Sequence, residues 1–126
     1  MYDDDRQRAA RAVRAEMIGD DGSRTAPPGD PVPPDYQDYL TAMAWGVWAR
    51  GGPLTHRDRS LLVLAMTAAT GRMDEFRIHL RASVNAGVSD DEVNELLYQI
   101  TAYCGAPAGN AARSVIREVR TAREAV

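Results

Sequence analysis

Residues 89–104 read SDDEVNELLYQITAYC and carry the clearest helix signal in the chain. Ser89 and Glu92 have the spacing of a capping box, in which each side chain accepts a hydrogen bond from the other residue's backbone amide. The apolar residues that follow share one helix face: Val93, Leu96, Leu97 and Ile100. The segment predicts an amphipathic helix that ends at Gly105.

Helices are also predicted on both sides of this segment. On the C-terminal side, Pro107 suits the first turn of a helix. Its expected buried stripe consists of Ala108, Ala111, Ala112, Val115, Ile116 and Val119. On the N-terminal side, Asp74 can cap a helix that Gly87 ends. The apolar face of that helix is expected to contain Phe76, Leu80 and Val84.

Three more helices are predicted in the N-terminal half. Thr55 and Asp58 resemble a capping box, and the body behind them, SLLVLAMTAAT, is apolar on nearly every side, as expected of a central helix. A helix over 35–50 is expected to bury one stripe, made of Tyr39, Leu40, Met43, Ala44, Val47 and Trp48. A first helix over 5–17 follows the acidic run Asp3–Asp5.

The predicted fold is therefore all-α, with about six helices. Residues 20–34, DDGSRTAPPGDPVPP, hold five of the seven prolines and should form a loop. No segment alternates as a strand does, and no repeat of useful length is visible. A length of 126 residues suits a single domain over 1–126.

The composition excludes several classes of function. All 15 basic residues are arginine, so Schiff-base chemistry on lysine and a phosphate loop with its lysine are both absent. A formal net charge of −3 and a pI of about 5.3 disfavour binding to nucleic acid. The single cysteine allows neither an internal disulfide nor a cysteine-rich zinc site.

Membrane insertion and export are also disfavoured. The apolar run at Leu61–Met66 is far shorter than the ~20 residues of a membrane span. The opening MYDDDRQR is acidic where a secretory signal is basic and then apolar. We expect a cytoplasmic protein.

The strongest candidate for acid–base chemistry is His79, which lies beside the apolar face of its predicted helix. A buried structural histidine is the competing interpretation. Arg72 and Arg81 lie on the same segment and could clamp a carboxylate, although a solvated charged face is also compatible with the pattern. Cys104 and Gly105 begin a run of small residues that fits either close helix packing or a ligand at a helix N-terminus. The two histidines lie in different helices, which disfavours a metal site.

Several separated motifs together resemble the carboxymuconolactone decarboxylase family, especially its 4-carboxymuconolactone decarboxylase branch. The similarity extends from about Val13 to Ala112 and includes an early VRAEMIGDD. Its most specific pieces are Trp45–Gly46 with Trp48, RSLL at 59–62, HLRASVNAG at 79–87 and AYCGAPA at 102–108.

This resemblance implies the helical fold of alkylhydroperoxidase D-like proteins and a homo-oligomer, commonly a trimer or a hexamer. It also implies decarboxylation of a small carboxylated lactone to 3-oxoadipate enol-lactone, in the protocatechuate branch of the β-ketoadipate pathway. That reaction needs no metal or organic cofactor. For it we expect His79 as proton donor and Arg72 or Arg81 as carboxylate clamp, with Cys104, Gly105 and Trp45 lining the substrate pocket.

One position departs from the family pattern, because Val47 stands where an acidic residue is expected. Two alternatives therefore stay open. One is a non-catalytic oligomer that binds a small acid. The other is a thiol-dependent, peroxidase-like antioxidant protein that uses Cys104, although the CxxC pair of the alkylhydroperoxidases is missing.

Overall fold

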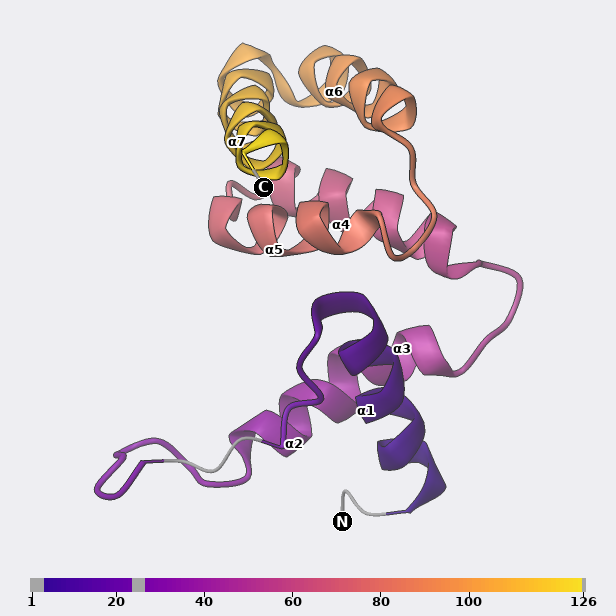
Figure 1. The fold of residues 1–126 in the computed structure, drawn as a ribbon, viewed down its shortest axis with the longest axis vertical. Coiled ribbons are helices and arrows are strands. Elements are labelled where there is room, and N and C mark those ends of the chain that lie inside the picture. The colour runs from indigo at the N-terminus through magenta and orange to yellow at the C-terminus, as the bar shows by residue number, and fades with distance from the viewer. Residues whose placement is uncertain (1–3, 24–26, 126) are drawn as a thin grey trace. The chain divides into compact units, whose positions relative to one another are not determined.

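A computed structural model describes residues 4–23 and 27–125, and every regular element in these ranges is a helix. The predicted all-α class is therefore confirmed. Two compact units divide the chain, unit 1 at Met1–Pro53 and unit 2 at Leu54–Val126 (Figure 1). Unit 1 contains α1 (Asp5–Ile18), α2 (Tyr36–Leu40), η1 (Thr41–Trp45) and α3 (Gly46–Ala49). Unit 2 contains α4 (His56–Ala69), α5 (Met73–Ser83), α6 (Asp90–Cys104) and α7 (Ala106–Glu124).

The limits of α1 follow from local signals. The Asp4 carboxylate accepts hydrogen bonds from the backbone amides of Arg6 and Gln7, at 3.0 and 3.2 Å. Gly19 ends the helix at φ 77°, a left-handed conformation that glycine adopts without a steric cost. Asp3, which was also expected to open the helix, lies outside the described residues. So do residues 24–26 of the predicted loop, whose described parts contain no helix.

A polar seam joins α1 to the second helical segment of unit 1. Arg14 is only 8% exposed, and its guanidinium donates to Thr41 Oγ1 at 2.9 Å and to Gln37 Oε1 at 3.2 Å. Nε of the same side chain donates to the Asp20 carbonyl at 3.0 Å. These bonds satisfy most of the donors of a buried cation, and they fix which face of α2–η1 meets α1.

That face is not the one expected from apolar spacing. Trp48 of the predicted stripe is buried, but Tyr39, Met43 and Val47 are about half exposed within the structure, and the other buried residues are Thr41 and Trp45, which were not predicted. Apart from Trp48, the prediction was wrong, because the bond from the buried Arg14 to Thr41 turns the side of Thr41 and Trp45 inward, and apolar spacing contains no such contact. The segment also contains a π-helical turn, η1, in which the amide of Gly46 bonds the Thr41 carbonyl.

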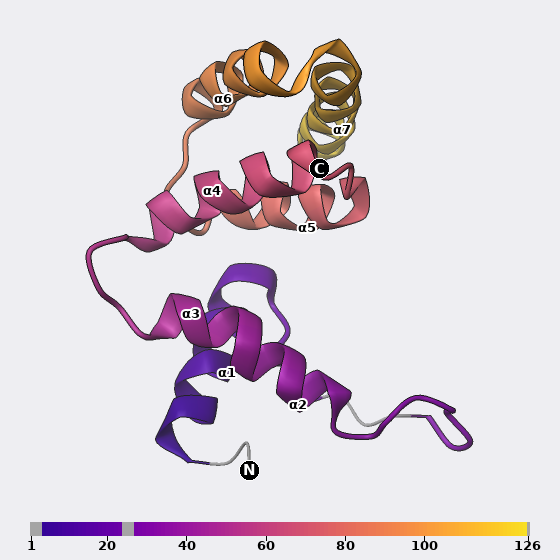
Figure 2. The same ribbon diagram turned by 180° about the vertical axis from the view of Figure 1, so that it is seen from behind.

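Unit 2 is built around an apolar core. α4 and α5 pack against each other, and α6 and α7 lie together on one side of that pair (Figures 1 and 2). The core residues are Leu64, Ala68, Phe76, Leu80, Val88, Val93, Ile100, Ala112, Val115, Ile116 and Val119. Most of the residues predicted to face the core from α5, α6 and α7 are among them.

The capping signals predicted for unit 2 are present with one exception. Ser89 and Glu92 exchange hydrogen bonds of 3.0 and 3.1 Å, and Thr55 and Asp58 do the same. The exception is α5, whose N-cap is Arg72, without a side-chain bond, instead of Asp74.

Two burial predictions for unit 2 were wrong. Val84 follows the end of α5 and is 54% exposed, so it does not extend the Phe76–Leu80 face. Within unit 2, α4 is not surrounded, because Leu62 and Met66 are 42% and 60% exposed. Its buried residues, Ser60, Leu64 and Ala68, form one stripe at i, i+4 and i+8.

Close packing of α6 and α7 accounts for part of the small-residue run. A Cβ added to Gly109 would lie 2.1 Å from Thr101 Oγ1, so the two helices approach each other more closely than any larger residue allows. In the parts of the chain that the structure describes, no helix is both long and apolar enough to cross a membrane.

Candidate active site

His79 occupies the half-buried side of α5, one residue before Leu80 of the core. The turn before it contributes Phe76, which has no exposed surface. This position removes water from the imidazole, and burial lowers the pKa of His79 below its usual value, since the charged form loses hydration. The neutral ring is therefore the main form near pH 7.

Glu75 lies one helical turn before His79 and was not among the expected site residues. Its negative charge raises the pKa of His79 and so offsets part of the effect of burial, because a nearby negative charge favours the imidazolium. The i, i+4 spacing of the two residues was a signal for this contact in the sequence. The pair makes the protonation state of His79 sensitive to charge in its surroundings.

The three arginines of this segment differ in what they bind. Arg77 donates to both carboxylate oxygens of Glu118 on α7, at 2.5 and 3.3 Å, and to Asp74 at 3.1 Å. These bonds raise the pKa of Arg77 above its usual value, and the bond to Glu118 has the largest effect. Arg77 therefore ties α5 to α7 and is not available to a substrate.

Arg72 and Arg81 are exposed, and neither has a carboxylate partner among the residues that the structure describes. Their positions relative to His79 differ. Arg81, two residues after His79 at ~100° per residue, lies on nearly the opposite side of α5, whereas Arg72 is the N-cap, outside the helical turns and about 10 Å before His79 along the axis. The helix register thus disfavours Arg81 as the partner of His79 and leaves Arg72 as the candidate.

A second group of predicted residues meets where α6 passes into α7. Cys104 is exposed at the end of α6. Gly105 follows at φ 94° and precedes α7, whose N-terminus has no side-chain cap. The first backbone amides of this 19-residue helix are thus free to face a negative charge.

The predicted residues form two groups on unit 2 and one residue on unit 1. Glu118, which binds Arg77, lies thirteen residues after Gly105 on α7, or about 20 Å along the helix axis. Trp45 belongs to unit 1, where it is 5% exposed and packs against Trp48 with ring centroids 5.0 Å apart. A direct contact of Trp45 with substrate stays a prediction.

Metal ligands are not gathered in this region. Within residues 4–23 and 27–125, no three side chains of the His, Cys, Asp and Glu types are placed to hold an ion together. The arrangement offers instead an imidazole of lowered pKa, two free guanidinium groups and an uncapped helix N-terminus. These groups can bind anions and move a proton.

Comparison with known proteins identifies a matching family and two related proteins. A model of the carboxymuconolactone decarboxylase family matches residues 34–118. The 4-carboxymuconolactone decarboxylase of Acinetobacter baylyi is 40% identical over 121 residues, which cover 94% of this chain and 90% of that protein. The nitrosuccinic acid decarboxylase of Metarhizium robertsii is 38% identical over 72 residues, covering 56% of this chain and 50% of that protein.

Proposed function

Because the chain belongs to the carboxymuconolactone decarboxylase family and is a decarboxylase of a carboxylated substrate, we propose that its substrate is 4-carboxymuconolactone or a closely related carboxylated lactone. The observation that supports the proposal is His79, half-buried on α5, with the unpaired Arg72 at the N-cap of the same helix. Loss of CO₂ from such a substrate needs an anion site and one proton, and this pair can supply both.

The chemistry begins with cleavage of the bond between the lactone γ-carbon and its carboxylate. The electron pair stays on the lactone, where it is delocalised through the ring double bond onto the carbonyl oxygen as a dienolate. A proton is then added at the α-carbon, which gives the enol-lactone. Overall, one carboxylate and one proton become one C–H bond and one CO₂.

His79 is the proposed source of that proton. The neutral imidazole of the free protein is too weak an acid, but a bound dianion favours the imidazolium, as Glu75 already does. Substrate binding therefore protonates the His79 imidazole, and the imidazolium then donates this proton to the dienolate. Because burial destabilises the imidazolium, it gives up this proton more readily than an exposed histidine does.

The remaining groups are proposed to hold the substrate. Arg72 binds one carboxylate, and Arg81 is the alternative clamp that the helix register favours less. The amides after Gly105, with Cys104 beside them, offer a second anion site. Because Gly105 lies about 20 Å along α7 from Glu118, the partner of Arg77, these amides face the oxyanion only if a neighbouring subunit of the proposed oligomer supplies them. No proposed step uses a metal or an organic cofactor.

The test is turnover by the full chain. Purified protein is mixed with 4-carboxymuconolactone generated in place, and CO₂ release and enol-lactone formation are followed. We expect turnover in the wild type and a loss in kcat of about 10²-fold or more in His79→Gln. His56→Gln, which changes the only other histidine, is the matched control and should keep its activity.

The outcomes separate the alternatives. Full activity in His79→Gln would refute the proton-donor role. Saturable binding of the lactone without CO₂ release would favour a non-catalytic acid-binding protein. Nitrosuccinic acid, tried in parallel, shows whether the substrate is a different small acid. Cys104→Ser should keep decarboxylase activity, and a peroxidase activity that it abolishes would favour the antioxidant alternative.

We also propose that the protein is a homo-oligomer, a trimer or a hexamer. Large apolar side chains are exposed on unit 2, and exposed apolar surface is typical of contacts between subunits. They are Leu54, Leu62, Met66, Ile78, Val84, Tyr98 and Tyr103. Sedimentation velocity measures the assembly directly, and a monomer at micromolar concentration would refute this part.

A further inference from the structure

The exposed side of α6 and α7 carries charged residues that the proposed reaction does not use. Thr101 of α6 lies against Gly109 of α7 near the turn between them, and at the far end the Asp90 carbonyl accepts a hydrogen bond of 3.0 Å from Arg120. The two helices therefore run antiparallel and form a hairpin, which lies on one side of α4 and α5 (Figure 2). The face of this hairpin that points away from α4 and α5 is called the outer face below.

A stripe of exposed residues follows α6 on the outer face. Its members are spaced by four, three and four residues: Asp91, Glu95, Tyr98 and Ala102. At ~100° per residue they lie within about 60° of one another, on the side of the helix opposite Val93 and Ile100 of the core. Tyr98 is 73% exposed. In the described parts of the chain, neither acidic side chain of this stripe has a basic partner.

A second stripe of exposed residues follows α7 on the same face. Taken from the C-terminal end, its members have the same spacing of four, three and four residues: Arg117, Arg113, Asn110 and Ala106. They too lie within about 60° of one another, on the side opposite Val115 and Val119 of the core. Neither guanidinium of this stripe pairs with a carboxylate from residues 4–23 or 27–125.

The two stripes are complementary when they oppose each other in antiparallel directions. Asp91 then faces Arg117, and Glu95 faces Arg113. At the other end of the stripes the small side chains of Ala102 and Ala106 allow the two backbones to approach. Like charges one helical turn apart repel each other, so each stripe gains most from a partner of opposite charge and the same spacing. Such a partner is the other stripe.

Within one chain the two stripes cannot oppose each other, because both point away from α4 and α5. A second copy can supply the opposing stripes if a two-fold axis runs parallel to the hairpin. This rotation lays α6 of each copy antiparallel on α7 of the other. The register also fits. Counted from the Thr101–Gly109 contact, Glu95 and Arg113 lie at heights that differ by only about 3 Å along the hairpin, within the reach of their side chains.

We propose that the outer faces of two hairpins pack together as a four-helix contact between two copies of this chain. The ion pairs Asp91–Arg117 and Glu95–Arg113 each form twice across it. The inference rests on the homo-oligomer proposed above and is independent of the decarboxylase reaction. A two-fold contact makes the number of subunits even, so of a trimer and a hexamer only the hexamer contains it.

Charge reversal of the full chain tests the contact. Glu95 and Arg113 are exposed and lie inside their helices, so Glu95→Arg and Arg113→Glu should keep the helical circular dichroism of the wild type. Each variant alone places two pairs of like charges against each other. In a dilution series followed by sedimentation velocity, we expect a wild-type hexamer. Each variant should dissociate to half that mass at a concentration about tenfold higher than the wild type does, or more.

A mixture of the two variants shows whether the pairing is between copies. In a mixed contact, the arginine introduced at position 95 faces the glutamate introduced at position 113, and the other Glu95–Arg113 pair is that of the wild type. A 1:1 mixture should therefore recover the wild-type association. Pairing within one chain, or cover of this face by another part of the same chain, would give no recovery on mixing.

Arg117→Glu is the matched control for the register, because it makes the same change one helical turn further along the stripe. Alone, it should weaken association as Arg113→Glu does, since it opposes Asp91. Mixed with Glu95→Arg, it should give no recovery, because the introduced arginine still faces Arg113.

Several results would overturn the proposal. They are unchanged association in both Glu95→Arg and Arg113→Glu, no recovery in their mixture, and equal recovery with Arg117→Glu. A wild-type trimer would refute the two-fold contact and leave the homo-oligomer standing, whereas a monomer would refute both. Lactone turnover is measured separately, so a failure of the decarboxylase proposal is distinguishable from each of these results.

Discussion

The two units of the chain are held together by different interactions. Unit 2 has a continuous apolar core contributed by all four of its helices. The buried side chains of unit 1 include fewer large apolar groups and several polar ones: Gln7, Ala10, Arg14, Met17, Thr41, Trp45 and Trp48. Burial of apolar area stabilises unit 2 without regard to direction, whereas unit 1 depends on hydrogen bonds that need particular partners. Unit 2 should therefore be most sensitive to lost volume, and unit 1 to lost polar groups.

The largest effect is expected from Phe76→Ala in unit 2. Phe76 has no exposed surface, and its truncation leaves a cavity that costs about 3–5 kcal/mol in the free energy of unfolding. Urea denaturation followed by circular dichroism measures this loss. Ile78→Ala, on the same helix but 39% exposed, is the control and should cost about 1 kcal/mol.

The same experiment shows whether the units unfold together. Both tryptophans of the chain, Trp45 and Trp48, lie in unit 1, so their fluorescence reports on that unit alone. If Phe76→Ala shifts the fluorescence and dichroism transitions equally, the chain unfolds as the single domain that its length predicts. An unchanged fluorescence transition would mean that unit 1 unfolds by itself.

A smaller effect, with its origin in unit 1, is expected from Arg14→Met. The change keeps most of the side-chain volume but leaves Thr41 and Gln37 without their buried donor, at a cost of about 2–3 kcal/mol. Tryptophan fluorescence during urea denaturation is the measurement. Arg8→Met, at a side chain that is 72% exposed, should change stability by less than about 0.5 kcal/mol. Equal effects of the two changes would contradict the importance of the polar seam.

The smallest effect is expected from pH. Because burial lowers the pKa of His79, the unfolded chain binds a proton at this residue more readily than the folded one. Stability should therefore fall as the pH decreases through ~6.5, the value for an unfolded histidine. His79→Gln should show a flatter dependence between about pH 7.5 and 5.5. Identical slopes in the two proteins would contradict the lowered pKa.

Sequence reasoning predicted most of the fold because its signals are local. The capping pair Ser89 and Glu92 and the glycine after α1 act over three or four residues, and the structure contains both. The same reasoning failed for the stripe at Tyr39, Met43 and Val47. A residue 27 positions away in the chain, Arg14, determines the burial of Thr41, and no local pattern contains that contact.

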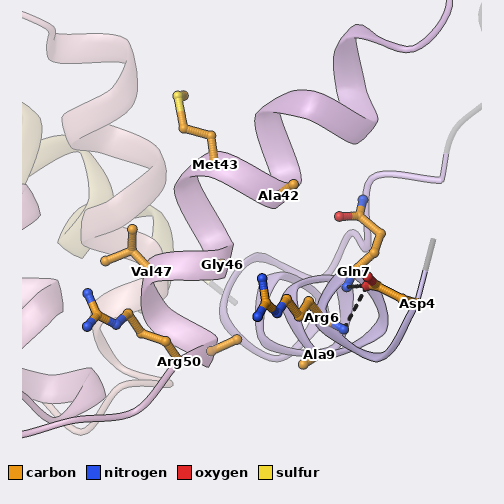
Figure 3. A pocket seen from close by; sticks show the side chains of 10 residues that line it. Asp4, Arg6, Gln7, Ala9, Ala42, Met43, Gly46, Val47 and Arg50 are labelled. Atoms are coloured by element: carbon orange, nitrogen blue, oxygen red, sulfur yellow. Dashed lines mark hydrogen bonds between the residues drawn. The ribbon is translucent and has the colours of Figure 1, made fainter. Parts of the chain in front are cut away.

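In the candidate site, too, local features could be predicted from the sequence and contacts between distant segments could not. The half-buried position of His79 could be predicted from its spacing to Phe76 and Leu80. The pairing of Arg77 with Glu118, 41 residues apart, could not, although it decides which arginines remain free for a substrate. A hollow in unit 1, with Arg6, Gln7 and Arg50 among its lining residues (Figure 3), was also missed, because α1 and α3 are separated by the proline-rich loop and meet only in the folded unit.

By itself, the sequence determined the helical class, most of the helix ends, the family and the residue types available for chemistry. These properties depend on propensity, capping and periodicity, which act within a few turns of chain. The tertiary structure alone decided which face of each helix is buried, which charges are paired and where a hollow forms. Those properties depend on contacts between distant segments, whose free energies outweigh local preference.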